Sequence, residues 1–134
     1  MHIGSLWFKL FSMKSFLTLF FILLFASCTK ELKYSKEELY FKARAADPTT
    51  TFILPRTMTE GVHCGDYPEG CISAHTVQVQ KLDFIGVEFM TEEQAKFAAK
   101  KVRGFYVRNW MLDDVTGEPM LEKFVQESLE AKKP

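Results

Sequence analysis

The chain has 134 residues, of which 17 are Lys or Arg and 17 are Asp or Glu, so its formal net charge is zero. This length is enough for one small domain with a hydrophobic core. The even balance of charge gives no reason to expect a strongly basic face, and therefore no charge-driven case for binding nucleic acid or an anionic membrane surface. We therefore expect no nucleic-acid partner.

A short basic and apolar leader begins the chain. Lys14 precedes an apolar run over residues 16–25, and the small residues Ala26 and Ser27 stand directly before Cys28. A positive charge, a compact apolar run and small residues before a cleavage point are the three parts of a secretory signal peptide. We therefore expect residues 1–27 to be removed on export.

This leader resembles that of bacterial lipoproteins, in which a lipobox ends in a cysteine. The resemblance rests on Ala26-Ser27-Cys28. It implies that Cys28 carries the lipid, becomes the first residue of the mature chain and holds it in the bilayer. Lipoproteins with Asp after the cysteine are commonly kept in the inner membrane, and Thr29 stands there. The resemblance thus implies the cell envelope, with sorting to the outer membrane, facing the periplasm or the cell surface.

Two alternatives to lipidation stay open from the sequence. An ordinary cleaved signal peptide would leave Cys28 as an odd thiol in an oxidising space. A membrane span needs about 20 apolar residues. The uncharged stretch over residues 15–29 is shorter than that. Either Met1 or Met13 begins the chain.

Residues 28–48 predict a lipidated tether followed by a short helix. Ser35 and Glu38 form a capping-box pattern. In this pattern the side chain of each residue accepts a hydrogen bond from the backbone N–H group of the other. Asp47 precedes Pro48, and the residue before a proline disfavours the helical region, so the helix ends there.

Residues 49–134 predict one small domain, whose first part is rich in turns. The segment before residue 74 contains several Gly and Pro residues and one candidate strand over 51–54. Alternation of Val with Gln predicts a strand over 76–80, and the alternation returns at 87–89. Gly86 is expected to bend or interrupt this second stretch.

The second part of the domain shows the clearest pattern. Thr91 and Gln94 predict a capping box at the start of a helix that stops at Gly104. An aromatic strand over 105–112 and a loop lead to a last helix with Pro119 in its first turn. The order strand, helix, strand, helix predicts an α+β sandwich, with helices packed on one face of a small sheet.

Cys64 and Cys71 enclose a short segment with two Gly residues and one Pro. If the lipid takes Cys28, these two remain as an even pair in an oxidising compartment, where a disulfide is the expected state. Closing so short a loop contributes about 2.5 kcal/mol in the chain-entropy model. We expect a stapled segment over residues 61–75.

His63 and His75 flank this pair, so an alternative is a metal-dependent or enzymatic module that uses both histidines and both thiols. The spacing argues against zinc, because His63 and Cys64 are adjacent and point apart in an extended chain. Disulfide formation is therefore the preferred interpretation, and no metal or other cofactor is predicted.

Three carboxylates, Asp113, Asp114 and Glu118, lie close together in the sequence. Their spacing differs from that of a calcium loop, and no nucleophile accompanies them. Acidic residues before a helix are favoured by the helix dipole alone. We therefore predict no catalytic residues and no enzyme.

Tyr106, Arg108 and Trp110 share one face of the predicted strand by alternation. They form a candidate binding surface of aromatic and cationic groups. The alternative is that they belong to the core, with the arginine at its edge.

Three segments together resemble the first half of a SPOR domain, a small envelope module that binds peptidoglycan: Val77–Gln80, Glu93–Lys96 and Gly104–Arg108. The sequence as a whole predicts a lipid-anchored, non-enzymatic envelope lipoprotein. Its partner is either another envelope protein or, as the SPOR resemblance implies, peptidoglycan.

Overall fold

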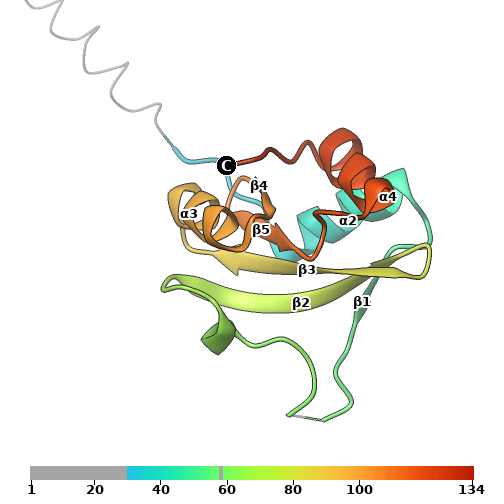
Figure 1. The fold of residues 1–134 in the computed structure, drawn as a ribbon, viewed down its shortest axis with the longest axis horizontal. Coiled ribbons are helices and arrows are strands. Elements are labelled where there is room, and N and C mark those ends of the chain that lie inside the picture. The colour runs from blue at the N-terminus through green and yellow to red at the C-terminus, as the bar shows by residue number, and fades with distance from the viewer. Residues whose placement is uncertain (1–29, 58) are drawn as a thin grey trace, which may run out of the picture. The chain divides into compact units, whose positions relative to one another are not determined.

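Five antiparallel strands form the sheet of this domain in the computed structural model, which describes residues 30–57 and 59–134. The predicted signal peptide and Cys28 lie outside the described residues. The spatial order is β1-β2-β3-β5-β4 (Figure 1). The strands are β1 (Thr51–Ile53), β2 (Cys71–Val79), β3 (Leu82–Phe89), β4 (Phe105–Val107) and β5 (Trp110–Asp113).

Three α-helices accompany the sheet in the described part of the chain. They are α2 (Lys36–Ala46), α3 (Glu92–Val102) and α4 (Pro119–Lys123), and α4 continues as a π-helical turn over Phe124–Ser128. The predicted α+β class is confirmed. The helix α2 buries Leu39 and Ala43 in the main core, so it belongs to the same unit, Leu32–Pro134, as the sheet.

The predicted helix starts follow from their capping residues. At α2 the capping box is complete, because Ser35 N–H donates to Glu38 Oε2 at 2.7 Å and Glu38 N–H donates to Ser35 Oγ at 3.1 Å. At α3 only one half forms, since Gln94 N–H donates to Thr91 Oγ1 at 3.1 Å. The side-chain oxygen of Gln94 is buried without a hydrogen-bond partner, and this side chain packs against Gly70 instead.

The end of α3 differs from the sequence prediction in its physical cause. Arg103 takes the left-handed conformation at the helix end, with φ of 56°. Gly104 follows with an ordinary φ, but a Cβ atom there would clash with the carbonyl oxygen of Leu112. Glycine is therefore required by the close approach of β5, not by the turn that ends the helix.

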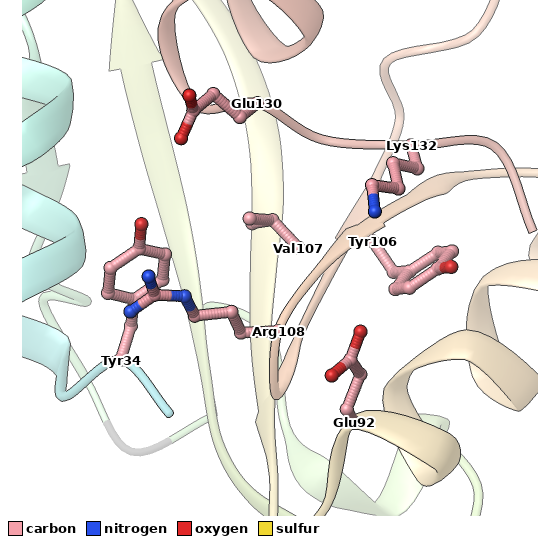
Figure 2. A pocket seen from close by; sticks show the side chains of 7 residues that line it. All are labelled: Tyr34, Glu92, Tyr106, Val107, Arg108, Glu130 and Lys132. Carbon is pink, nitrogen blue, oxygen red and sulfur yellow. The ribbon is translucent and has the colours of Figure 1, made fainter. Parts of the chain in front are cut away.

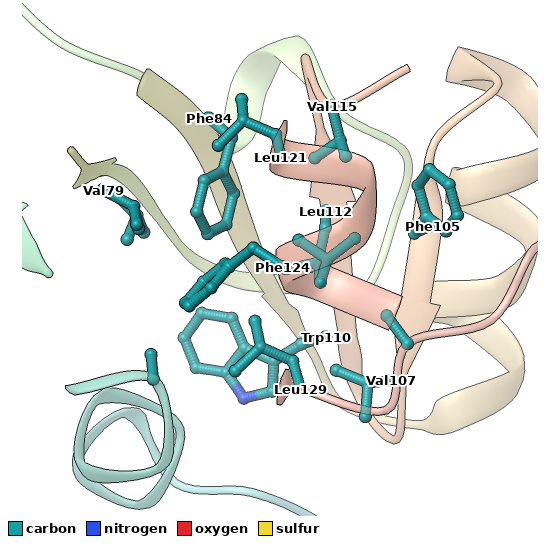
Figure 3. Packing of buried hydrophobic residues seen from close by; sticks show 14 of the residues in the cluster. Val79, Phe84, Phe105, Val107, Trp110, Leu112, Val115, Leu121, Phe124 and Leu129 are labelled. Atoms are coloured by element: carbon teal, nitrogen blue, oxygen red, sulfur yellow. The ribbon is translucent and has the colours of Figure 1, made fainter. Parts of the chain in front are cut away.

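Helices cover both faces of the sheet, whereas the sequence predicted one. Alternation along the strands sends Trp110 and Leu112 to one face and Met111 to the other. The first face packs against α2, α4 and the π-helical turn (Figure 3). The second packs against three alanines of α3, namely Ala95, Ala98 and Ala99. Each face of the sheet thus has its own buried cluster.

The last helix buries an apolar stripe. Pro119 stands in its first turn, and the stripe consists of Leu121, Phe124, Val125 and Leu129. All four are buried in the main cluster, where Phe124 faces Phe84 of β3 with ring centroids 6.4 Å apart. The strand β3 runs without a break through Gly86.

The aromatic segment over residues 105–112 forms two strands, not the single strand that was predicted. Val107 pairs with Trp110, so Arg108 and Asn109 are the two residues of a hairpin turn. Arg108 takes a left-handed conformation, with φ of 50°. Tight turns of this kind usually place glycine at the first position. The turn reverses the chain, and Tyr106 and Trp110 consequently lie on opposite faces.

The hairpin between β2 and β3 gives a direct test of local strain. Gln80 has a φ of 48° and Lys81 has a φ of 68°. A two-residue turn of mirror-image type requires positive φ at both positions. Lys81→Gly should raise the free energy of unfolding by about 1 kcal/mol, because glycine adopts this conformation without steric cost. Urea denaturation measures the change.

The matched control for this prediction is Lys100→Gly in α3, where the backbone is helical. There the same substitution should lower the free energy of unfolding by about 1 kcal/mol, since glycine is a poor helix former. A loss of stability at Lys81 similar to that at Lys100 would contradict the strain argument.

Candidate functional site

Cys64 and Cys71 are joined by a disulfide, with their Cα atoms 5.5 Å apart. The predicted staple is confirmed. It ties a short 3-10 turn, Cys64–Asp66, to the first residue of β2. Tyr67 adds a second tie from this segment, since its hydroxyl donates to Asp113 Oδ2 at 3.0 Å. Burial, and then the negative charge of Asp113, raise the pKa of Tyr67 well above its usual range.

The histidines of the alternative metal site do not converge with this pair. Both sulfur atoms are bonded to each other, and the ring of His75 stacks on Phe52 with centroids 5.5 Å apart. Burial, with a smaller contribution from Lys36, lowers the pKa of His75. Within residues 30–57 and 59–134, no three His, Cys, Asp or Glu side chains are grouped so that they could hold a metal ion.

His75 lies instead beside a cavity of about 420 Å³ between β2 and the loop after β1. Its Nε2 atom is buried and has no hydrogen-bond partner. The ring is also 6.2 Å from that of Trp110, centroid to centroid. This histidine is therefore part of an aromatic stack at the edge of the main core.

The carboxylates of the predicted acidic loop have structural contacts. Asp113 accepts from Tyr67 and, through its other oxygen, from the backbone N–H of Asp114 at 2.8 Å. Glu118 stands at the position before α4. A negative charge there is favoured by the helix dipole. The structure thus gives a physical reason for acidic residues here that needs no ligand.

A group of hydrogen bonds lies where the segment before α2 meets the β4–β5 turn. The side-chain amide of Asn109 makes two hydrogen bonds with the backbone of Tyr34. Tyr34 N–H donates to Asn109 Oδ1 at 2.7 Å, and Asn109 Nδ2 donates to Tyr34 O at 3.3 Å. The indole Nε1–H of Trp110 donates to the same carbonyl oxygen at 3.0 Å. We call Tyr34, Arg108, Asn109 and Trp110 the clasp.

The side chain of Arg108 stacks on the ring of Tyr34. Its guanidinium carbon lies 3.9 Å from the centre of the Tyr34 ring. This is stacking distance for a cation–π contact. The left-handed backbone of Arg108 costs about 1–2 kcal/mol relative to glycine. The cation–π contact offsets part of this cost.

Lys42 of α2 also contacts Tyr34. Its Nζ donates to Tyr34 Oη at 3.1 Å and to Glu130 Oε2 at 2.7 Å. The hydrogen bond to Glu130, followed by that to Tyr34, raises the pKa of Lys42. Glu130 is largely exposed. This ion pair therefore contributes little stability.

A cavity of about 310 Å³ opens beside the clasp (Figure 2). Its lining comes from the segment before α2, the start of α3, the strand β4 with its turn, and the last residues of the chain: Tyr34, Glu92, Tyr106, Val107, Arg108, Glu130 and Lys132. Tyr34 and Arg108 lie on one side, with Tyr106 and Lys132 on the other. Reciprocal backbone hydrogen bonds of 2.8 and 2.9 Å join Tyr106 to Lys132.

The predicted surface of Tyr106, Arg108 and Trp110 is thus divided. Tyr106 and Arg108 line the cavity, whereas Trp110 is fully buried in the main core. Sequence reasoning missed Tyr34 and Asn109, which lie 75 residues apart along the chain. No local pattern signals a contact over that separation.

No family model, no curated protein and no solved structure matches this chain. The resemblance to SPOR domains therefore stays a prediction. In residues 30–57 and 59–134, no helix has the length and apolarity needed to cross a bilayer.

The clasp predicts a specific loss of stability. Asn109→Ala leaves the backbone N–H of Tyr34 without its acceptor. Loss of that acceptor should lower the free energy of unfolding by roughly 1–3 kcal/mol. Urea denaturation measures the loss.

The control for the clasp is Tyr34→Phe, which removes only the hydroxyl that contacts Lys42. Because the clasp uses the backbone of Tyr34, this change should alter stability by roughly 0.5 kcal/mol or less. Equal losses of stability in Asn109→Ala and Tyr34→Phe would contradict the conclusion that the hydrogen bonds between Asn109 and the Tyr34 backbone stabilise the fold.

The disulfide predicts a different pattern. Cys64→Ser and Cys71→Ser each remove the same bond. Each should cost about 2.5 kcal/mol, the chain-entropy value for so short a loop. The double variant should cost little more than either single one, because one bond is lost in all three. Thermal unfolding with and without reductant measures this, and additive losses would show that each cysteine contributes separately.

Proposed function

We propose that this protein is an envelope lipoprotein, anchored through acylated Cys28, whose small domain has a non-enzymatic binding or structural role. The observation that carries the proposal is the clasp. It fixes the chain to the domain at Tyr34, about six residues after the proposed lipid attachment site. An extended chain of that length reaches at most about 20 Å.

The consequence of so short a tether is a restricted position. A domain attached by a long flexible linker would sample distant partners, whereas this one stays next to the bilayer. The clasp also fixes where the tether joins the domain, because Tyr34 is held beside the β4–β5 turn. This arrangement supports a role at the membrane surface.

The polar groups of the clasp and of the disulfide-linked segment support a binding or structural role. Asn109, Asp113 and Tyr67 all have partners that fix one chain segment to another. A catalytic group needs a free reactive atom placed beside a second functional group. The cavity beside the clasp offers aromatic and charged side chains. Such side chains suit recognition of another molecule in the envelope, such as a protein or peptidoglycan.

The proposal is tested at Cys28. Intact-mass analysis of protein from solubilised envelopes should show a chain that begins at Cys28 and carries added lipid. Cys28→Ala should abolish retention in the membrane, whereas Cys64→Ser, which leaves the leader intact, should not. Wild-type protein that is fully soluble, or a mass without lipid, would refute the anchor.

A further inference from the structure

We propose that the surface around the clasp binds the anionic phospholipid headgroups of the membrane that holds the anchor. This proposal rests on the proposed function, and it names the first partner of the domain. The surface is defined by four cationic residues, which we call the basic rim: Lys33, Arg108, Lys132 and Lys133.

The fold brings these four residues together from three parts of the chain. Lys33 precedes Tyr34 of the clasp, and Arg108 stacks on the Tyr34 ring. Lys132 is held beside β4 by its backbone hydrogen bonds to Tyr106. Lys133 follows, with its Nζ 5.9 Å from the centre of the Phe105 ring. Figure 1 shows the end of the chain next to the segment that leads into α2.

The charges of the rim are accessible to a ligand. Lys33, Lys132 and Lys133 are exposed, and Arg108 is half-buried. The guanidinium of Arg108 lies over the Tyr34 ring. Stacking uses the face of this planar group, whereas its N–H donors lie around the edge, where they suit phosphate oxygens.

Neighbouring carboxylates only partly offset this charge. Glu130 is paired with Lys42, and its charge also interacts with that of Arg108. Glu92 lines the cavity and adds a negative charge there. The four cations of the rim outnumber the two carboxylates that line the cavity, so the fold gathers local positive charge that the neutral composition of the chain did not predict.

The strength of headgroup binding depends on the distance between the basic rim and the bilayer. Electrostatic attraction to a membrane fades within a Debye length of about 8 Å at physiological salt. A tether of at most about 20 Å limits how far these cations can move from the bilayer, so they can reach that range. Each Lys or Arg close to an anionic bilayer strengthens binding by about fivefold. A lipid surface is therefore favoured over a soluble phosphate compound, which gains nothing from the anchor.

The fixed position of the Arg108 side chain adds geometric support. Its ring contact holds the guanidinium beside the departing tether. The turn thus places a fixed cationic group beside Tyr34, where the tether joins the domain.

The experiment uses the full acylated protein in two kinds of vesicle, pure phosphatidylcholine and phosphatidylcholine with phosphatidylglycerol. Flotation first measures whether the protein is anchored in both. Modification of lysines by an amine-reactive reagent is then followed by mass spectrometry. Lys33, Lys132 and Lys133 should react at least about threefold more slowly on the anionic vesicles, and high salt should remove the difference.

Lys81 and Lys123 provide the internal control. They are exposed at the far end of β3, where the β2–β3 turn and the end of α4 lie, and their rates should be the same on both vesicles. A Lys132→Gln, Lys133→Gln double variant should lose most of the protection of Lys33. The double variant Lys81→Gln, Lys123→Gln, with the same change of net charge, should keep it.

Each outcome separates the two proposals. Protein that fails to float with phosphatidylcholine vesicles refutes the lipid anchor. Protein that floats with both, but whose rim lysines react equally on both, refutes headgroup binding and leaves the anchor standing. Equal loss of protection in the two double variants would also refute headgroup binding by the basic rim, because it would show an effect of net charge alone.

Discussion

One buried amide, that of Asn109, joins three segments that are distant in the sequence. Its oxygen accepts from Tyr34, and its nitrogen reaches the carbonyl oxygens of Tyr34 and Phe89. The backbone oxygen of Asn109 also accepts from Phe89 N–H at 2.8 Å. Because a buried amide is costly unless its hydrogen bonds are made, all three segments must come together for the turn to be stable. The end of β3, the β4–β5 hairpin and the start of α2 are thereby fixed as one unit.

The two-sided core follows from this turn. A single strand over residues 105–112 would have placed Tyr106 and Trp110 on one face. The hairpin instead sends Trp110 to the larger cluster, with Phe84 and Phe124, and leaves Tyr106 with the alanines of α3 on the other. Alanine allows α3 to lie close to the sheet. The approach of Gly104 to the Leu112 carbonyl shows how close the end of this helix comes to β5.

The success of the sequence predictions depended on whether the determining contact was local. The capping box of Ser35 and Glu38, the helix opened by Pro119 and the Cys64–Cys71 pair lie within a few residues of their partners, and all three form as expected. The hairpin turn was missed, because Arg108-Asn109 contains no glycine and the flanking residues alternate as in one strand. The clasp was missed since its partner, Tyr34, lies in another part of the sequence.

Arg108, the first residue of the β4–β5 turn, is subject to two opposing effects, backbone strain and the cation–π contact with Tyr34. A glycine at position 108 would relieve the left-handed backbone, but it would remove the cation–π contact that covers Tyr34. The contact and the strain are of similar size, roughly 1–2 kcal/mol each, so stability alone gives little reason to prefer arginine. A side chain with no clear stabilising advantage, at the point where the tether departs, is consistent with a role in what the domain contacts. Because the strain and the contact nearly cancel, the choice of arginine at this turn is explained by the membrane surface that we propose as the partner of the domain.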